Sequence, residues 1–538
     1  MQRIRILRIM VLLTALLVAV IVLRSPYAPP VEPWREIEEI WEIEDTRQES
    51  EVPLVTRLSN SGMLLGYDGE DRTFYCPVGL ENGESWPQLH LTAPGASGVR
   101  ICWVDDYLYD WCDEAVAEGY SYELIAYTDE EYDYFNIVFT GLPIVSVYTQ
   151  EPLSIEDSGV AVTICDGKEA MSTDGQMHMR GNATLVKYDK KSYKLSMTAG
   201  GKKAQQKVPG LCTTDEVILL SMITDDSLMH DRLGWELVSR LTSEEDSFSP
   251  RPNAYAELFI NDRYAGVYLM LEAYDNAQEI AKSGGNALQS DGLYRTAHVS
   301  SERDGGRMFI EDPLLENLCY ELFFAPEKGD AFGPLEEYFK LQLKDDEAFA
   351  LQAPQILDMR SFLMYDLFIQ ATGNYDTVHN NTYFWAHDLN GKYRYKVLPW
   401  DLDLGWGVDM GQRMERWIPF LTVDRMLQLN AGNARQMLLD IWNEMKAAGF
   451  SVESIGEITQ GYMDELNDSG AFRREYDRWA RSTGAADNTS ILNYCEMRFD
   501  LLDKTIEEIA SAPDKPIVFL LGAQYRVYNP PIIRMIEE

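Results

Sequence analysis

The segments Gly373–Asn381 (GNYDTVHNN) and Leu398–Gly407 (LPWDLDLGWG) decide how this chain is interpreted. Between them, Asn381–Ala386 and Arg394–Leu398 are rich in aromatic and β-branched residues and flank Asn390-Gly391, a dipeptide that favours a tight turn. This pattern predicts a β-hairpin. Because the two polar segments adjoin the open end of one hairpin, we expect their side chains to lie close together.

Hard oxygen ligands are concentrated in these two segments. Asp376 and Asn381 stand in the first, and Asp401 and Asp403 stand two residues apart in the second. Carboxylate and amide oxygens, together with water and phosphate oxygens, are the ligands that Mg²⁺ prefers. We therefore expect Asn381, Asp401 and Asp403 to bind a divalent cation that is shared with a phosphate-containing ligand.

The chain between 143 and 272 predicts a lobe of strands with one helix. In Lys190–Met197 (KKSYKLSM) alternate residues share one face of a strand. Asp225 favours a helix N-terminus, and apolar residues follow at helical spacing as far as Leu241. Further strands are predicted at 144–148, 160–165, Tyr255–Ile260 and Ala265–Glu272. Helices are predicted over 358–371 and most of 433–510, so the fold class is α+β.

The first 142 residues predict three further units. Residues 1–24, with arginines before an apolar run, are typical of a secretory signal or transmembrane anchor that places the body outside the cytoplasm. Residues 25–56 are proline-rich and then acidic, as in a stalk or linker. Residues 57–142 predict a small all-β sandwich, and 511–538 form a C-terminal tail.

The charge balance excludes some partners. The chain has 87 acidic and 47 basic residues and a formal net charge of −40, so nucleic acid would be repelled. A basic macromolecule would be attracted instead. The seven cysteines are scattered, without the spacing of a disulfide scaffold or a structural zinc site.

Several ordered motifs resemble the CotH (spore coat protein H) kinase family. They are Arg180-Gly-Asn, Lys191-Ser-Tyr, the strand segment Gly266-Val-Tyr-Leu, Gly373-Asn-x-Asp and Pro399-Trp-Asp-x-Asp. Together they are more specific than any one of them.

The resemblance covers about 143–510. It implies a bilobal, atypical protein-kinase-like fold and transfer of the γ-phosphate of ATP, with Mg²⁺, to protein hydroxyls. Substrates in the family include Ser- and Lys-rich surface or coat proteins. A basic, Ser-rich protein outside the cytoplasm therefore suits the acidic chain.

The resemblance also implies roles for individual residues. Asp376 and Asn381 stand in the D-x-x-x-x-N relation of a kinase catalytic loop, in which the aspartate orients or deprotonates the substrate hydroxyl and the asparagine binds a metal. Either Asp401 or Asp403 corresponds to the metal-binding aspartate that follows. Lys191 is expected to pair with the nucleotide phosphates, with Lys190 and Lys194 as alternatives.

Three more residues are assigned to the nucleotide. Glu236 is the expected salt-bridge partner of Lys191, Arg180 is expected to hold a phosphate, and Glu272 is expected at a hinge beside adenine. The chain lacks a G-x-G-x-x-G loop and an H-R-D triplet, so the loop near Gly181 is a candidate for gripping ATP, and AMP transfer stays an alternative.

Two other classes of function remain open. Asp401-x-Asp403 is also the pattern of the metal-binding motif in nucleotide-sugar glycosyltransferases, which indicates a metal-dependent glycosyl or nucleotidyl transferase. The other class is a catalytically inactive surface scaffold or adhesion protein. Transfer from a UDP-sugar rather than from ATP distinguishes the first, and the absence of any transfer distinguishes the second.

Overall fold

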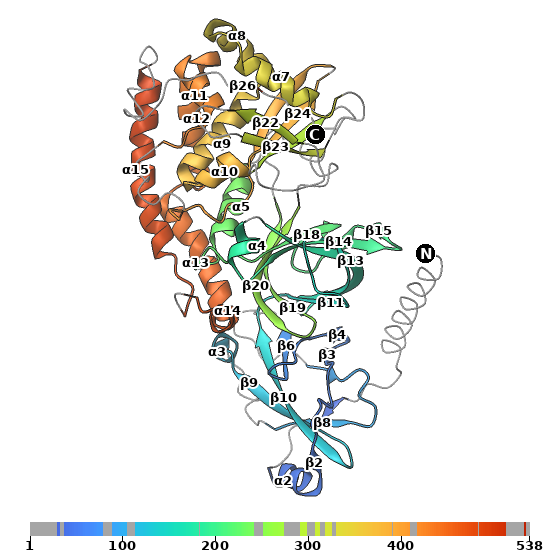
Figure 1. Ribbon diagram of the computed structural model, residues 1–538. Helices are drawn as coiled ribbons and strands as arrows, with labels where there is room; N and C mark the ends of the chain where they lie inside the picture. The colour runs from blue at the N-terminus through green and yellow to red at the C-terminus, as the bar shows by residue number, and fades with distance from the viewer. Residues whose placement is uncertain are drawn as a thin grey trace, which may run out of the picture. The chain divides into compact units, whose positions relative to one another are not determined.

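A computed structural model describes residues 30–32, 37–78, 89–104, 113–181, 183–241, 251–273, 291–297, 307–311, 318–324, 330–389, 391–408, 417–481, 484–512 and 532–533 (Figure 1). The fold is mixed α+β, as predicted. The chain divides into two compact units. Unit 1 consists of Met1–Ser221, Ala254–Leu271 and Asp464–Ala486; unit 2 consists of Met222–Asn253, Glu272–Met463 and Asp487–Glu538.

The helices that the model describes include none with the length and apolar character needed to cross a bilayer. The predicted signal or anchor at 1–24 lies outside the described residues, as does nearly all of the predicted tail at 511–538.

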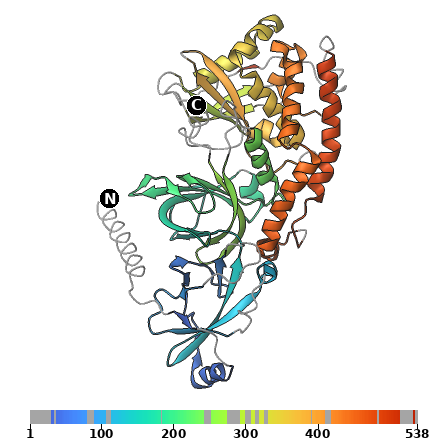
Figure 2. The ribbon, with the colours of Figure 1, turned by 180° about the vertical axis from the view of Figure 1, so that it is seen from behind.

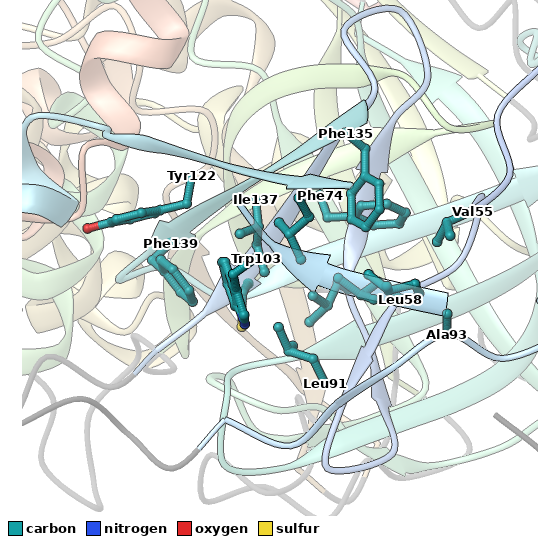
Figure 3. Packing of buried hydrophobic residues seen from close by; sticks show 14 of the residues in the cluster. Val55, Leu58, Phe74, Leu91, Ala93, Trp103, Tyr122, Phe135, Ile137 and Phe139 are labelled. Carbon is teal, nitrogen blue, oxygen red and sulfur yellow. The ribbon is translucent and has the colours of Figure 1, made fainter. Parts of the chain in front are cut away.

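The first part of unit 1 is a seven-stranded sheet in the order β1-β8-β9-β10-β6-β5, with β2 paired to β10. Phe74 and Phe135 meet edge to face in its core, with ring centroids 5.4 Å apart (Figure 3). Helix α2 (Ile37–Thr46) buries Ile40 and Ile43 in a second cluster with Tyr127, so this part of the 25–56 segment packs on the sheet. The strands are β1 Val31–Glu32, β2 Gln48–Glu49, β5 Gly66–Asp68, β6 Thr73–Pro77, β8 Arg100–Trp103, β9 Ser121–Tyr127 and β10 Glu131–Thr140; a small sheet holds β3 Ser59–Asn60, β4 Met63–Leu64 and β7 Leu91–Thr92, and α3 spans Asp113–Ala117.

The second part of unit 1 is a closed β-barrel. The strands follow the order β13-β12-β11-β19-β20-β18-β14, and β14 pairs back with β13. Tyr193, Leu195 and Met197 alternate along β14 and point into the apolar interior, which confirms the predicted face of this strand. The strands are β11 Ile144–Thr149, β12 Ser158–Cys165, β13 Ala170–Arg180, β14 Ser192–Ala199, β18 Glu216–Leu220, β19 Asn253–Ile260 and β20 Tyr264–Glu272, with β15 Lys202–Lys203 added to β14. The remaining elements are helix α4 Ala183–Lys187 and the pair β16 Gln206–Lys207 and β17 Thr213–Thr214.

The barrel and the N-terminal sheet share a core. Tyr75 of β6 packs against Phe259 and Tyr264 of the β19–β20 hairpin, with ring centroids 4.9 and 5.5 Å away. Arg474 of helix α14 (Ala471–Trp479) joins both parts, because it donates to both carboxylate oxygens of Glu257 at 2.8 Å and to the hydroxyl of Thr140 at 2.8 Å.

Unit 2 combines an antiparallel sheet with a helical bundle. The predicted hairpin is confirmed: β24 (Tyr383–Asp388) pairs with β25 (Tyr393–Leu398), and Tyr383 faces Leu398 at the open end. The sheet order is β25-β24-β21-β23-β22-β26, with β21 Gly292–Ala297, β22 Arg307–Glu311, β23 Leu318–Phe324 and β26 Ile532–Ile533.

Helix α9 (Met359–Thr372) is the centre of this unit. It packs against β25, α12 (Ala434–Ala448) and α15 (Thr489–Ser511). The helices of this bundle are drawn in orange and red in Figure 1 and, from behind, in Figure 2. Asp358 caps its N-terminus by accepting from the N–H of Ser361, so the helix predicted over 358–371 begins one residue later. The other helices are α5 His230–Leu241, α7 Gly333–Gln342, α8 Asp346–Ile356, α10 Tyr375–Asn380 and α11 Leu421–Gln428, and α13 spans Val452–Asp468.

Candidate functional site

The site begins where α9 ends. Gly373 takes a left-handed conformation (φ 71°) that closes the helix, and the buried Asn374 precedes the short helix α10. Asp376 lies in the first turn of α10, and Asn381 follows its last residue. The local turn chemistry therefore places both predicted residues at the open end of the β24–β25 hairpin.

Asn381 lies between two carboxylates. Its amide Nδ2 is 3.2 Å from Oδ2 of Asp376 and 3.1 Å from Oδ2 of Asp401. The other oxygen of Asp376, Oδ1, accepts from the side-chain amide of Asn380 at 2.6 Å. Three of the predicted site residues, from the segments before β24 and after β25, are thus joined through one amide group.

Asp403 faces a different set of partners. Its Oδ2 accepts from the hydroxyl of Thr224 at 2.5 Å, and its backbone carbonyl lies 3.0 Å from Nδ1 of His230. Burial raises the pKa of Asp403 well above its ordinary value, and the neighbouring carboxylates of Asp401 and Asp231 raise it further. This concentration of negative charge favours a bound cation.

The residues fit a Mg²⁺ ion that is held partly by a nucleotide. Within the described ranges, no group of three or more His, Cys, Asp or Glu side chains is arranged to hold a metal. Mg²⁺ in phosphate-transferring sites usually takes one or two carboxylates and completes its shell with water and substrate phosphates. The amide nitrogen of Asn381 holds the carboxylate of Asp401 at 3.1 Å, and the amide oxygen of Asn381 and the carboxylate of Asp401 are the donors that such a shared site would use.

The predicted phosphate-binding residues lie in unit 1. Arg180 ends β13, opposite Ser192 of β14, and is half-buried. The ammonium group of Lys191 donates to the carbonyl of Leu185 at 2.7 Å and to that of Tyr188, so it closes the loop that contains α4. Lys194 lies 3.4 Å from Glu216.

Lys190 forms a buried ion pair that the sequence did not suggest. Its ammonium group, fully withdrawn from solvent, is 2.7 Å from Oε1 of Glu475 and 2.6 Å from the carbonyl of Val267. Arg481 donates to the same oxygen of Glu475 at 2.7 Å. Burial lowers the pKa of Lys190 to about 8, although the charge of Glu475 opposes that shift.

The expected pairing of Lys191 with Glu236 stays a prediction, because the two residues belong to different units and each has a local partner. Glu236 forms an ion pair with Arg240 one turn further along α5, at 2.8 Å, and Lys191 is bound to backbone carbonyls. Among the lysine–glutamate pairs of unit 1, that of Lys190 with Glu475 has both side chains fully buried. Glu272 lies at the end of β20, buried, with its carboxylate 3.5 Å from Nη1 of Arg251.

Other residues near the aspartates were also missed. Arg295 of β21 is buried, donates to Glu321 at 2.9 Å and lies over the rings of Phe323 and Tyr383. Burial alone would lower its pKa, but Tyr383, Glu321 and Asp401 raise it above the ordinary value. Its position in the short strand Gly292–Ala297 gave no sign of a charged role, because cross-strand partners are not visible in a sequence.

A buried acid in α9 predicts a pH dependence. Asp366 accepts from Nε2 of Gln370 at 3.0 Å, and its Oδ2 has no hydrogen-bond partner among the described residues. Burial raises its pKa to about 7, although Gln370 and Arg498 oppose this. The folded state therefore holds a proton that the unfolded state releases near pH 4, and stability falls as the pH rises from about 4 to 7, by on the order of 4 kcal/mol.

Asp366→Asn is expected to remove this loss, because the amide is neutral at every pH. The thermal midpoint of the variant relative to wild type should rise between pH 5 and pH 8. An equal difference at both pH values would show that Asp366 carries the same charge throughout.

The CotH kinase protein family model matches residues 177–498, more than half of the chain. The match begins within β13 and includes α10 and the Asp401–Asp403 segment. No curated protein matches the chain significantly. The motifs, the hairpin with its polar open end and this family match agree, and the chain belongs to the CotH kinase family.

Proposed function

We propose that the chain is a Mg²⁺- and ATP-dependent protein kinase of the CotH type that phosphorylates serine or threonine. The observation that carries this proposal is the amide of Asn381 between the carboxylates of Asp376 and Asp401. That arrangement brings a base for a hydroxyl group beside two ligands for a metal.

Each member of the site has a proposed role. Asp376 orients the acceptor hydroxyl and takes its proton, since it is half-buried and fixed by two side-chain amides. Asn381 and Asp401 hold Mg²⁺, which would neutralise charge on the transferring phosphoryl group. Asp403 remains a candidate ligand, but its carboxylate is engaged by Thr224, so Asp401 is favoured as the main one.

The nucleotide side of the proposal rests on the barrel of unit 1 and on Glu272, the last residue of β20, which belongs to unit 2. A bilobal arrangement would use the barrel as the first lobe, with Lys191 and Arg180 holding phosphates and Glu272 beside adenine. The full burial of Lys190 in its pair with Glu475 supports Lys191 over Lys190 for this task, because a phosphate would have to displace a satisfied ion pair.

The cellular setting is also a proposal. Residues 1–24 would tether or export the chain, and the domain over 143–510 would act outside the cytoplasm. The net charge of −40 supports a basic, Ser-rich protein acceptor over nucleic acid.

Labelled ATP tests the reaction. Residues 25–538, incubated with a Ser- and Lys-rich peptide and Mg²⁺, should transfer label from [γ-³²P]ATP and none from [α-³²P]ATP, and EDTA should stop the transfer. Label from the α-position alone would show AMP transfer. Label from a UDP-sugar would show glycosyl transfer, and no transfer from any donor would favour a scaffold.

A further inference from the structure

The peptide bond between Asp401 and Leu402 is hydrogen-bonded on both sides. The carbonyl of Asp401 accepts from Nδ2 of Asn374 at 2.8 Å and from the hydroxyl of Thr377 at 3.0 Å. On the other side, the N–H of Leu402 donates to Oδ1 of Asp231 at 3.1 Å. The orientation of this peptide plane is therefore set by three side chains distant in sequence.

The backbone at this point needs such support. Asp401 has a φ of 61°, in the left-handed region that residues with a β-carbon seldom adopt. Residues held there usually depend on surrounding contacts that leave no alternative. The bonded plane fixes the ψ of Asp401, and loss of its left-handed φ/ψ pair would turn the Cα–Cβ bond of Asp401 relative to Asn381.

Asp231 lies on the face of α5 that packs against the turn from Trp400 to Leu402. Asp231, Gly234 and Trp235 are three and four residues apart and so share one side of the helix. A β-carbon at Gly234 would lie 2.6 Å from Cδ1 of Leu402, so the leucine packs directly on the helix backbone. The ring of Trp235 meets that of Trp400 edge to face at 5.6 Å.

We infer that Asp231 is a positioning residue for Asp401: its carboxylate holds the N–H of Leu402 and thereby fixes the left-handed turn that points Asp401 at Asn381. The inference rests on the proposed role of Asp401 in binding the cation. A carboxylate is suited to this task because a charge-assisted acceptor binds an N–H more strongly than a neutral one. Thr224 fixes the carboxylate of Asp403 from the same part of the chain.

Two substitutions separate the hydrogen bond from the charge. Asp231→Asn keeps an acceptor oxygen of the same size, whereas Asp231→Ala removes it. Loss of a hydrogen bond to a charged acceptor should raise amide hydrogen exchange in the peptide covering 399–406 about tenfold to a hundredfold in Asp231→Ala. Asp231→Asn, whose neutral oxygen is a weaker acceptor, should give a smaller increase. The kcat for peptide phosphorylation should fall in parallel, with the KM for the acceptor peptide unchanged.

Further variants keep the test decisive. Arg240→Gln alters the exposed side of the same helix and should leave both readouts unchanged. If Asp231→Ala does not fold, Thr377→Val removes a hydrogen bond from the other side of the same peptide and should also accelerate exchange in 399–406.

The outcomes distinguish this inference from the proposed function. Wild-type exchange and kcat in Asp231→Ala would overturn the inference, and so would equal impairment of Asp231→Ala and Asp231→Asn, which would indicate a role for the charge itself. Faster exchange in Asp231→Ala, in a protein whose wild type neither transfers phosphate nor binds Mg²⁺–ATP, would support the positioning of the turn and overturn the proposed kinase.

Discussion

Replacing Asp376 by alanine is expected to lower phosphate transfer by about 10²- to 10⁴-fold, the range usual for loss of a general base. The fold should survive, because Asp376 and its partner Asn380 are half-buried, and Asn381 keeps its hydrogen bond to Asp401. Initial rates with [γ-³²P]ATP measure the effect, and the thermal midpoint of unfolding verifies the fold.

Two comparisons sharpen this result. Asp388, at the far end of the same hairpin, caps the turn by accepting from the N–H of Gly391, and Asp388→Ala should retain the wild-type rate. Asp401→Asn should instead weaken Mg²⁺-dependent ATP binding in calorimetry, which Asp376→Ala should leave nearly intact. Equal rates in wild type and Asp376→Ala would remove Asp376 from the reaction.

The hairpin and its polar end were predictable because the signals are local. The turn dipeptide, the strand composition of Tyr383–Asp388 and Tyr393–Leu398, and the position of Asn381 directly before a strand all act within about twenty residues. Once the hairpin forms, Asn381 and Asp401 must lie near each other. The 3.1 Å contact between them follows from pairing that the sequence encodes locally.

The closure of the barrel was not predictable in the same way. Alternation along Lys190–Met197 identifies which side chains face the core, and the buried Tyr193, Leu195 and Met197 agree with it. It does not identify the neighbouring strands. The pairing of β14 with both β13 and β18 depends on long-range contacts, which strand patterns do not specify.

The adjacent residues Lys190 and Lys191 show that the burial of a single side chain also depends on long-range contacts. Lys190 is fully buried and Lys191 is half-buried, although the two are neighbours in the sequence. The partner of Lys190 is Glu475, which lies 285 residues later in the sequence. Local periodicity predicts helices in that part of the chain but does not show which of them contacts Lys190. The role of Asp231 is equally invisible in the sequence, where it is an ordinary acidic residue in the first turn of a helix.

Glu475→Ala is expected to destabilise unit 1 by about 3–5 kcal/mol, because removing one partner of a buried ion pair leaves an uncompensated charge. Here both Lys190 and Arg481 lose the carboxylate, and the N–H of Val267 loses its acceptor, 2.8 Å away. Urea unfolding at pH 7 measures the loss. Glu337→Ala, which breaks an exposed pair with Lys340, is the control and should cost little.

The pH dependence of this variant identifies the buried charge. The pKa of Lys190 is already lowered to about 8, and without Glu475 it should fall further. A lysine whose pKa is lowered in the folded state reduces the free energy of unfolding by the full amount below that pKa. The reduction becomes smaller as the pH rises towards the unfolded pKa near 10.4. The difference between Glu475→Ala and wild type should therefore be larger at pH 7 than at pH 9.5. A cost no larger than that of Glu337→Ala would contradict the burial of this pair.

The double variant Lys190→Met/Glu475→Leu then decides which lysine serves the nucleotide. Apolar side chains of similar volume often replace a buried ion pair without loss of stability, so the double variant should be more stable than Glu475→Ala. If it also binds Mg²⁺–ATP as wild type does, Lys190 serves to hold the barrel to helix α14, and Lys191 contacts the phosphates. If ATP binding is lost in a folded double variant, the buried pair itself must open to receive the phosphates, and the preference for Lys191 is wrong.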